Sequence, residues 1–139
     1  MSLSPLQKVK HTAPDLFSRY PVLFAYLYGS YAAGSAHARS DLDIGIYVES
    51  ATDNQALGIE LDLALALDKA LGHIVETEVR VINNLPLTFL GQIITDGILL
   101  YSRDENTRVE FEVQVRKKYF DFLPVIQDYH AAYLKTAGC

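Results

Sequence analysis

Two short motifs carry groups that could bind phosphate and divalent cations. Gly29 and Ser30 directly follow an apolar, aromatic run, and Asp41 and Asp43 stand at the opening of the next such run. A glycine lets the backbone approach a ligand without an intervening Cβ, and N–H groups at the start of a following helical turn point at phosphate oxygens. The Ser30 hydroxyl adds a donor. These residues predict a phosphate-binding turn beside a pair of carboxylates.

The two aspartates are expected to share one face of a strand over residues 42–48. Side chains alternate along a strand, so Asp41 and Asp43 point to one side while Leu42 and Ile44 point to the other, toward a core. Two carboxylates about 7 Å apart repel each other, and a bound pair of Mg²⁺ ions relieves that repulsion while acting on a phosphoryl group. One ion would hold a triphosphate and stabilise the leaving pyrophosphate, and the other would lower the pKa of the attacking hydroxyl.

A two-metal site needs a further oxygen ligand, and a strand predicted over residues 74–82 offers two candidates. Glu76 and Glu78 lie on a single face of that strand. Residue type and spacing leave both open. Arg39, in the loop before Asp41, is a further candidate, for contact with the leaving pyrophosphate.

The elements that position these groups follow from apolar periodicity and from helix start and stop signals. Strands are predicted over residues 22–28, 42–48 and 74–82, with a short extra strand over residues 98–102. Helices are predicted over residues 5–19, interrupted near Pro14 with Thr12 as a cap, over 53–71 with Asp53 as the cap signal, and over 86–95, opened by Pro86. This order predicts an α/β (α+β) fold in which flanking helices surround a small mixed sheet.

The segment over residues 104–136 carries apolar residues at steps of three or four, which marks one face of a helix. Those residues are Phe111, Val115, Tyr119, Phe122, Ile126, Tyr129 and Tyr133. Pro124 falls within the segment, so we expect a kink or two helices that meet there. The apolar face is expected to pack on the protein's own core.

Composition limits the functions that the chain can have. Its 139 residues, half of them hydrophobic, suit a single domain with a catalytic core over about residues 20–102 and C-terminal helices after it. The net charge is −5 and Lys and Arg are scattered, which disfavours a long nucleic acid and suits a free nucleotide with Mg²⁺. The lack of a long apolar run predicts a soluble cytoplasmic protein. The only cysteine, Cys139, excludes an internal disulfide and a thiolate metal cluster.

The spacing of these motifs resembles a known signature. Gly29 and Ser30, ten intervening residues and then Asp41-x-Asp43 are similar to the signature of the DNA polymerase β-like nucleotidyltransferase superfamily, specifically its minimal nucleotidyltransferase (MNT) branch. The resemblance extends through the first strand, Ser40, residues 83–86 and residues 97–101. It implies a polymerase β-like nucleotidyltransferase fold.

The resemblance also implies ligands and roles. ATP would be the substrate and Mg²⁺, in two ions, the cofactor; Asp41, Asp43 and Glu78 would be the catalytic metal ligands, and Gly29, Ser30 and Ser40 would bind the nucleotide. Small MNT proteins of this kind look like antitoxins of HEPN/MNT toxin–antitoxin pairs, which transfer AMP from ATP to a tyrosine of the HEPN toxin. The expected partner is therefore a cognate HEPN toxin in a hetero-oligomer.

Two departures from the family pattern keep other functions open. Ala33 stands where the family often has Arg, and Glu78 stands where Asp is usual. One alternative is a non-catalytic binder that neutralises its toxin by contact. Another is a small-molecule nucleotidyltransferase of the aminoglycoside-modifying kind, which the short chain disfavours because it leaves little room for a substrate domain.

Overall fold

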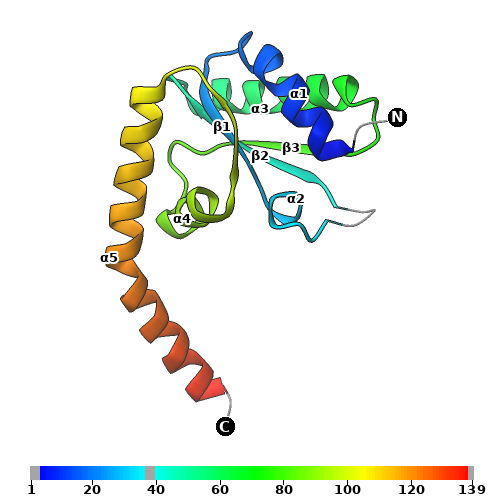
Figure 1. Ribbon diagram of the computed structural model, residues 1–139. Coiled ribbons are helices and arrows are strands. Elements are labelled where there is room, and N and C mark those ends of the chain that lie inside the picture. Colours follow the sequence, from blue (N-terminus) through cyan, green and yellow to red (C-terminus); the bar gives the residue numbers. More distant parts are fainter. Residues whose placement is uncertain (1–3, 37–39, 138–139) are drawn as a thin grey trace.

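The computed structural model describes residues 4–36 and 40–137, and it contains a four-stranded sheet with helices on both faces (Figure 1). The strand order is β3-β2-β1-β4, formed by β1 (Val22–Tyr28), β2 (Leu42–Val48), β3 (Thr77–Val81) and β4 (Ile98–Ser102). β1 is antiparallel to both β2 and β4, whereas β2 is parallel to β3. The predicted small mixed sheet with flanking helices is confirmed.

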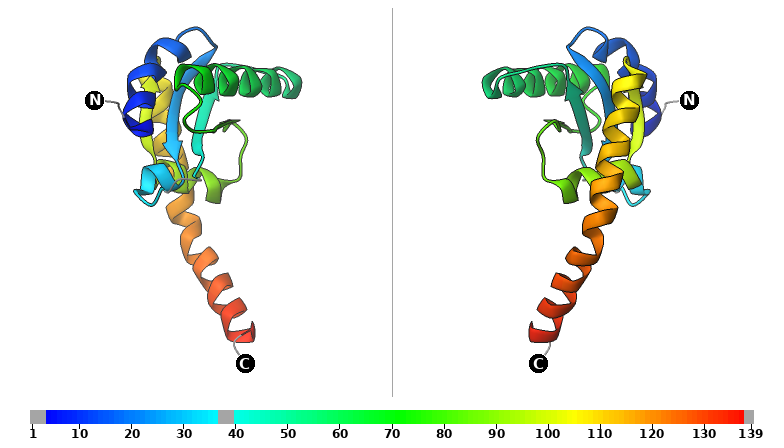
Figure 2. Two further views of the ribbon diagram at one scale, coloured as in Figure 1. Left: turned by 90° about the vertical axis from the view of Figure 1, so that its right-hand side faces the viewer. Right: turned by 90° about the vertical axis from the view of Figure 1, so that its left-hand side faces the viewer.

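The helices form two layers, one on each face of the sheet (Figure 1, Figure 2). α1 (Pro5–Phe17) and α3 (Asp53–Ala70) cover one face, while α4 (Leu87–Asp96) and the first part of α5 (Glu105–Ala137) cover the other. The short α2 (Ser30–Ala33) directly follows β1. Among the described residues, no helix has both the length and the apolar character needed to cross a membrane.

β2 separates two cores because its side chains alternate between the faces of the sheet. Leu42, Ile44 and Ile46 are fully buried in the core that contains α1 and α3. On the opposite face, Tyr47 stacks on Phe24 of β1, with ring centroids 4.6 Å apart. Asp43 follows the same alternation, so it lies on the face of the sheet that α4 and α5 cover.

Two carboxylates of α3 hold β3 in place. Asp68 Oδ1 accepts hydrogen bonds from the backbone N–H of Thr77 at 2.9 Å and from its hydroxyl at 2.7 Å. Glu60 Oε2 accepts a third from the N–H of Val81 at 2.8 Å. Because β3 is an edge strand, α3 satisfies donors that no neighbouring strand pairs with. Both ends of β3 are thereby attached to α3, and Glu78 lies between them.

The first helix is continuous, so the predicted interruption near Pro14 and the Thr12 cap are wrong. Ser4 is the N-cap; its hydroxyl accepts from Gln7 N–H at 3.2 Å, and Gln7 Oε1 accepts from Ser4 N–H at 3.0 Å. Pro14 lies inside the helix. Residues before and after the proline are fully buried, so packing outweighs the lost backbone hydrogen bond.

Two further boundaries differ from prediction. α3 is capped by Thr52 rather than Asp53, and Gln55 completes a reciprocal capping box. β3 begins at Thr77 rather than residue 74, because the chain turns through left-handed backbone at Gly72 (φ 69°) and His73 (φ 57°) after α3. The side-chain alternation already begins at residue 74, in the bend that follows this turn, and so the strand was predicted to begin too early.

α5 is one helix that changes direction in its second half, as Figure 1 shows, in agreement with the predicted kink rather than two helices. Phe111 and Val115 pack in the second core, but Phe122 is half exposed because the second half of α5 projects from the body. The expectation that the whole apolar face packs on the protein's own core is therefore wrong. The side chains of Ile126, Tyr129 and Tyr133 lie outside the described part of the structure.

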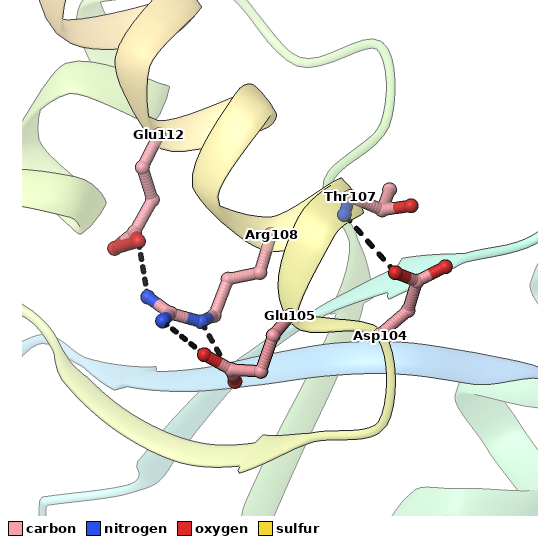
Figure 3. Close-up of polar contacts among 5 residues, drawn as sticks. All are labelled: Asp104, Glu105, Thr107, Arg108 and Glu112. Carbon is pink, nitrogen blue, oxygen red and sulfur yellow. Dashed lines mark hydrogen bonds and ion pairs between the residues drawn. The ribbon is translucent and has the colours of Figure 1, made fainter.

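A polar network fixes the start of α5 (Figure 3). Asp104 Oδ1 accepts from Thr107 N–H at 3.1 Å, which lowers the pKa of Asp104. Arg108 contacts both Glu105 and Glu112, one turn apart on either side. The hydrogen bond from Arg108 lowers the pKa of Glu105 to about 2. These contacts orient α5 before it reaches α4.

The contact between α4 and α5 depends on Gly91. A Cβ at this position would lie 2.1 Å from Cδ2 of Tyr119, so an alanine has no room. We expect Gly91→Ala to lower the free energy of unfolding by about 1–3 kcal/mol, as overpacking of a core does, despite the better helix propensity of alanine. Urea unfolding measures this. The control is Gly58→Ala in α3, where a Cβ meets no atom within 4 Å; a stability gain there and a loss at Gly91 are expected.

Candidate active site

The site centres on two carboxylates from neighbouring strands. In the parallel pairing of β2 with β3, Asp43 is the register partner of Glu78. Burial raises the pKa of Asp43, the charges of Glu78 and Asp41 raise it further, and Arg80 opposes them. The structure thus pairs Asp43 with Glu78, and the charge of Asp41 acts on the same carboxylate; a cation would relieve this repulsion.

Gly29 lies directly against this carboxylate pair. Its backbone has φ 76° and ψ −154°, a region that only glycine adopts readily. A Cβ on Gly29 would stand 2.3 Å from Asp43 Oδ2. The missing side chain is therefore what allows the turn between β1 and α2 to approach the carboxylate.

The same turn lines part of a cavity of about 370 Å³. Phe89 and Tyr28 form part of its wall, with ring centroids 5.4 Å apart in an edge-to-face contact. Burial, followed by the charge of Asp43, raises the pKa of Tyr28 to about 12, so its hydroxyl remains protonated. The full lining is Tyr28, Gly29, Ser30, Ala33, Ser35, Phe89, Gln92, Ile93 and Asp96.

The cavity does not contain the carboxylates themselves. Gly29 lines the cavity and also lies against Asp43. The volume lies within the range of small-molecule sites, and the wall is mostly apolar with a few polar groups. This arrangement can hold an apolar ring system next to a group that contacts the carboxylates.

Arg80 supplies positive charge at the site. Its Nη2 lies 3.4 Å from Glu78 Oε1, and its guanidinium lies 5.5 Å from the ring centroid of Phe89. Sequence reasoning missed Arg80, although it continues the alternation of Glu76 and Glu78 along β3 and could have been found by it. It also missed the α4 residues of the cavity, for which the sequence offers no motif.

The other predicted site residues are placed less closely. Asp41 is exposed and acts on Asp43 through its charge, and Ser40 is half buried beside it. Glu76 precedes β3, and its carbonyl accepts from Leu42 N–H at 2.9 Å. Arg39 and Cys139 lie outside the described residues. Within the described ranges, no three His, Cys, Asp or Glu side chains are already gathered as a metal-binding group.

A family model described as polymerase beta, nucleotidyltransferase matches residues 11–106, most of the chain. The chain belongs to this family. The matched residues run from β1 to β4 and include β2 and β3, which carry the carboxylates. Every element that forms the candidate site therefore lies within the matched region. Among curated protein sequences, none matches significantly.

Several solved structures share the fold of this nucleotidyltransferase. A toxin–antitoxin complex with AMP-PNP has a chain at 20% identity and TM-score 0.64, covering 95% of this chain and 98% of its own. An MntA–HpeT variant with two aspartate-to-glutamate changes has a chain at 19% identity and TM-score 0.67, and the alignment covers 99% of this chain and 100% of that chain. The complex of a tri-AMPylated Shewanella oneidensis HEPN toxin with an MNT antitoxin has a chain at 18% identity and TM-score 0.64, and the alignment covers 98% of this chain and 100% of that chain.

Proposed function

We propose that this protein is an antitoxin nucleotidyltransferase that transfers AMP from ATP to a tyrosine hydroxyl of a cognate HEPN ribonuclease toxin and thereby inactivates it. The observation that carries the proposal is the Asp43–Glu78 pair beside the Gly29 turn, which also lines a cavity. The tyrosine hydroxyl oxygen attacks the α-phosphorus of ATP. The bond between this phosphorus and the oxygen that bridges it to the β-phosphate breaks, and diphosphate leaves.

The residues present suit a divalent cation. Carboxylate oxygens are the ligands that Mg²⁺ prefers. The pKa of Asp43 is raised first by burial and then by the like charges of Glu78 and Asp41, which a cation would neutralise. Asp41, Asp43 and Glu78 would hold the ions. When bound, Mg²⁺ would offset the phosphate charge and lower the pKa of the attacking hydroxyl.

The neighbouring groups would orient the nucleotide. The Gly29 backbone lets the triphosphate approach Asp43, and Ser30, on the wall of the cavity, would donate a hydroxyl hydrogen bond to it, with Ser40 beside Asp41. The cavity whose wall Tyr28 and Phe89 help to form would take the base. Arg80 adds a cation beside Glu78, whereas Ala33, which stands where the family often has arginine, lies on the wall of the cavity.

Related complexes support the partner class. Their chains align with nearly all of this chain, and they contain a toxin with its antitoxin, one of them with the toxin AMPylated. In the substituted complex, the two changed aspartates are two positions apart, as Asp41 and Asp43 are. The projecting part of α5 offers exposed Phe120, Phe122 and Val125 for contact with such a partner. The same surface favours the second candidate, neutralisation by binding alone.

One experiment separates the two candidates. The protein is mixed with α-labelled ATP, Mg²⁺ and the toxin from the adjacent reading frame, with Asp41→Asn as the comparison. Label on the toxin that disappears with the variant supports catalysis. Neutralisation of toxin activity by the variant as fully as by wild type would contradict catalysis as the main mechanism and would favour binding.

Glu78 and Glu76 are matched for a test of the third ligand. The register places Glu78 beside Asp43, whereas Glu76 precedes the strand and is not among the groups that shift the pKa of Asp43. We expect Glu78→Gln to reduce the labelling rate by about 10²-fold or more, since a metal contributes several kcal/mol. Glu76→Gln should change it by less than about threefold. Equal losses in both variants would refute the assignment.

A further inference from the structure

The wall that α4 contributes to the cavity has an apolar row and a polar row. Phe89 and Ile93 are one helical turn apart, and so are Gln92 and Asp96. The two pairs lie side by side on one face of the helix, because together they occupy positions i, i+3, i+4 and i+7. A flat ring that rests on the apolar row can therefore present its edge to an amide and a carboxylate.

The two polar side chains of this row are free to bind a ligand. Gln92 and Asp96 are both exposed, and within the described part of the chain neither side chain has a hydrogen-bond or ion-pair partner. Asp96 is also the last residue of α4, where a negative charge is unfavourable because the helix macrodipole is negative at its C-terminal end. The carboxylate does not stabilise the local fold, which makes a role in ligand binding the better explanation.

The charge of the cavity indicates which part of a nucleotide it takes. Among the described residues that line it there is no Lys or Arg, and Asp96 gives it a negative charge. This charge repels a triphosphate but not a neutral base. The cavity therefore favours an orientation in which the phosphates lie at the Gly29 turn and the base lies against α4.

We infer that Asp96 and Gln92 recognise the base of the nucleotide and select one that carries an exocyclic amino group. This inference rests on the proposed function, from which the occupant of the cavity is taken. A carboxylate only accepts hydrogen bonds, so Asp96 accepts one from the amino group of adenine, and Gln92 donates one to an adjacent ring nitrogen. Uracil carries carbonyl oxygens instead of an amino group, and the carboxylate repels them. Guanine and cytosine also carry amino groups, so the selection is against uracil nucleotides.

Isothermal titration calorimetry with two triphosphates tests the selection. Purine riboside 5′-triphosphate is ATP without the amino group, and it retains the ring, the ribose and the phosphates. In the presence of Mg²⁺, the wild type should bind ATP about tenfold more tightly, as one hydrogen bond to a charged group provides. Asp96→Ala should reduce this ratio to less than about threefold, and Asp96→Asn, which keeps an uncharged acceptor, should give an intermediate ratio. The ratio cancels any effect of charge on the triphosphate, which both ligands share.

Two further variants and a melting curve provide the controls. Gln92→Ala should weaken the binding of both triphosphates equally, because both retain the ring nitrogens. Thr95→Ala changes an exposed residue of α4 that does not line the cavity, and it should alter neither affinity. Asp96→Ala should melt no lower than the wild type, since it removes a charge that the end of the helix disfavours. A loss of selectivity in that variant would therefore not come from unfolding.

The binding ratio and AMP transfer to the toxin are measured separately, so that the two hypotheses can fail separately. Equal binding of the two triphosphates by the wild type, or an unchanged ratio in Asp96→Ala, would overturn the selection. Label on the toxin together with equal binding would contradict the selection and leave the proposed function intact. A clear preference for ATP without label on the toxin would contradict the proposed function and support the roles of Asp96 and Gln92. A wild type that binds neither triphosphate would overturn both.

Discussion

Asp43→Asn is expected to abolish AMP transfer while making the protein more stable. On the proposed function the variant loses a carboxylate that would hold Mg²⁺, so the transfer rate should fall by about 10³-fold or more, as the loss of a several-kcal/mol metal contribution requires. It also removes the partly buried charge that Glu78 and Asp41 repel. Without divalent cations, the melting temperature should therefore rise above that of the wild type at neutral pH.

The pH dependence of stability follows from the sign of the pKa shift. The pKa of Asp43 is higher in the folded protein than in the unfolded chain. Between these two pKa values the folded state therefore binds more protons than the unfolded state. The wild type should gain stability as the pH falls through the folded pKa of Asp43, and the variant should lack this gain. Thermal melting across mildly acidic pH measures the difference. If Asp43→Asn is less stable than the wild type at neutral pH, repulsion of Asp43 by Glu78 and Asp41 does not destabilise the fold, and the prediction is contradicted.

Gly29→Ala is expected to inactivate the site for a steric reason. Alanine is disfavoured by the backbone at this position and would place Cβ 2.3 Å from Asp43 Oδ2, so the turn or the carboxylate must move. Strain of this kind costs about 1–3 kcal/mol. We expect the labelling rate to fall by about 10²-fold or more, because a displaced turn separates the phosphates from the carboxylates.

Gly34 provides the matched control for this substitution. It also has a positive φ, 75°, but a Cβ there meets no atom within 4 Å. Gly34→Ala should therefore lower stability by about 1 kcal/mol through backbone strain alone and retain most of the activity. Comparable losses of activity in the two variants, measured with labelled ATP and the toxin, would show that contact with Asp43 is not the cause.

The strands were predictable because their side chains alternate, and the positions of the helix ends were not. Leu42, Ile44 and Ile46 point into the core as the alternation predicts, and the strand over residues 98–102 is found with those bounds. The third strand was predicted too long because the same alternation already begins in the bend at residues 74–75. The end of the α5 packing was unpredictable, because the spacing of apolar residues does not reveal how far a helix extends past its neighbours.

The site was predictable as chemistry and only partly as geometry. Gly29, Asp41 and Asp43 could be proposed from residue type and spacing within one stretch of chain. The partnership of Asp43 with Glu78 depends on the register of two strands far apart in sequence, which neither strand encodes alone. Phe89, Gln92 and Asp96 reach the cavity only through the packing of α4, and no local pattern distinguishes them.

The hydrogen bonds from α3 to β3 connect opposite faces of the sheet mechanically. Asp68 holds Thr77 and Glu60 holds Val81, so a small translation of α3 along the sheet carries both residues with it. Glu78 lies between them and shares its register with Asp43. A movement of α3, for example when another molecule binds to it, would thus change the distance between the carboxylates of Asp43 and Glu78 without contacting them. Movement of α3 on one face of the sheet would thereby be transmitted through β3 to the candidate site on the opposite face.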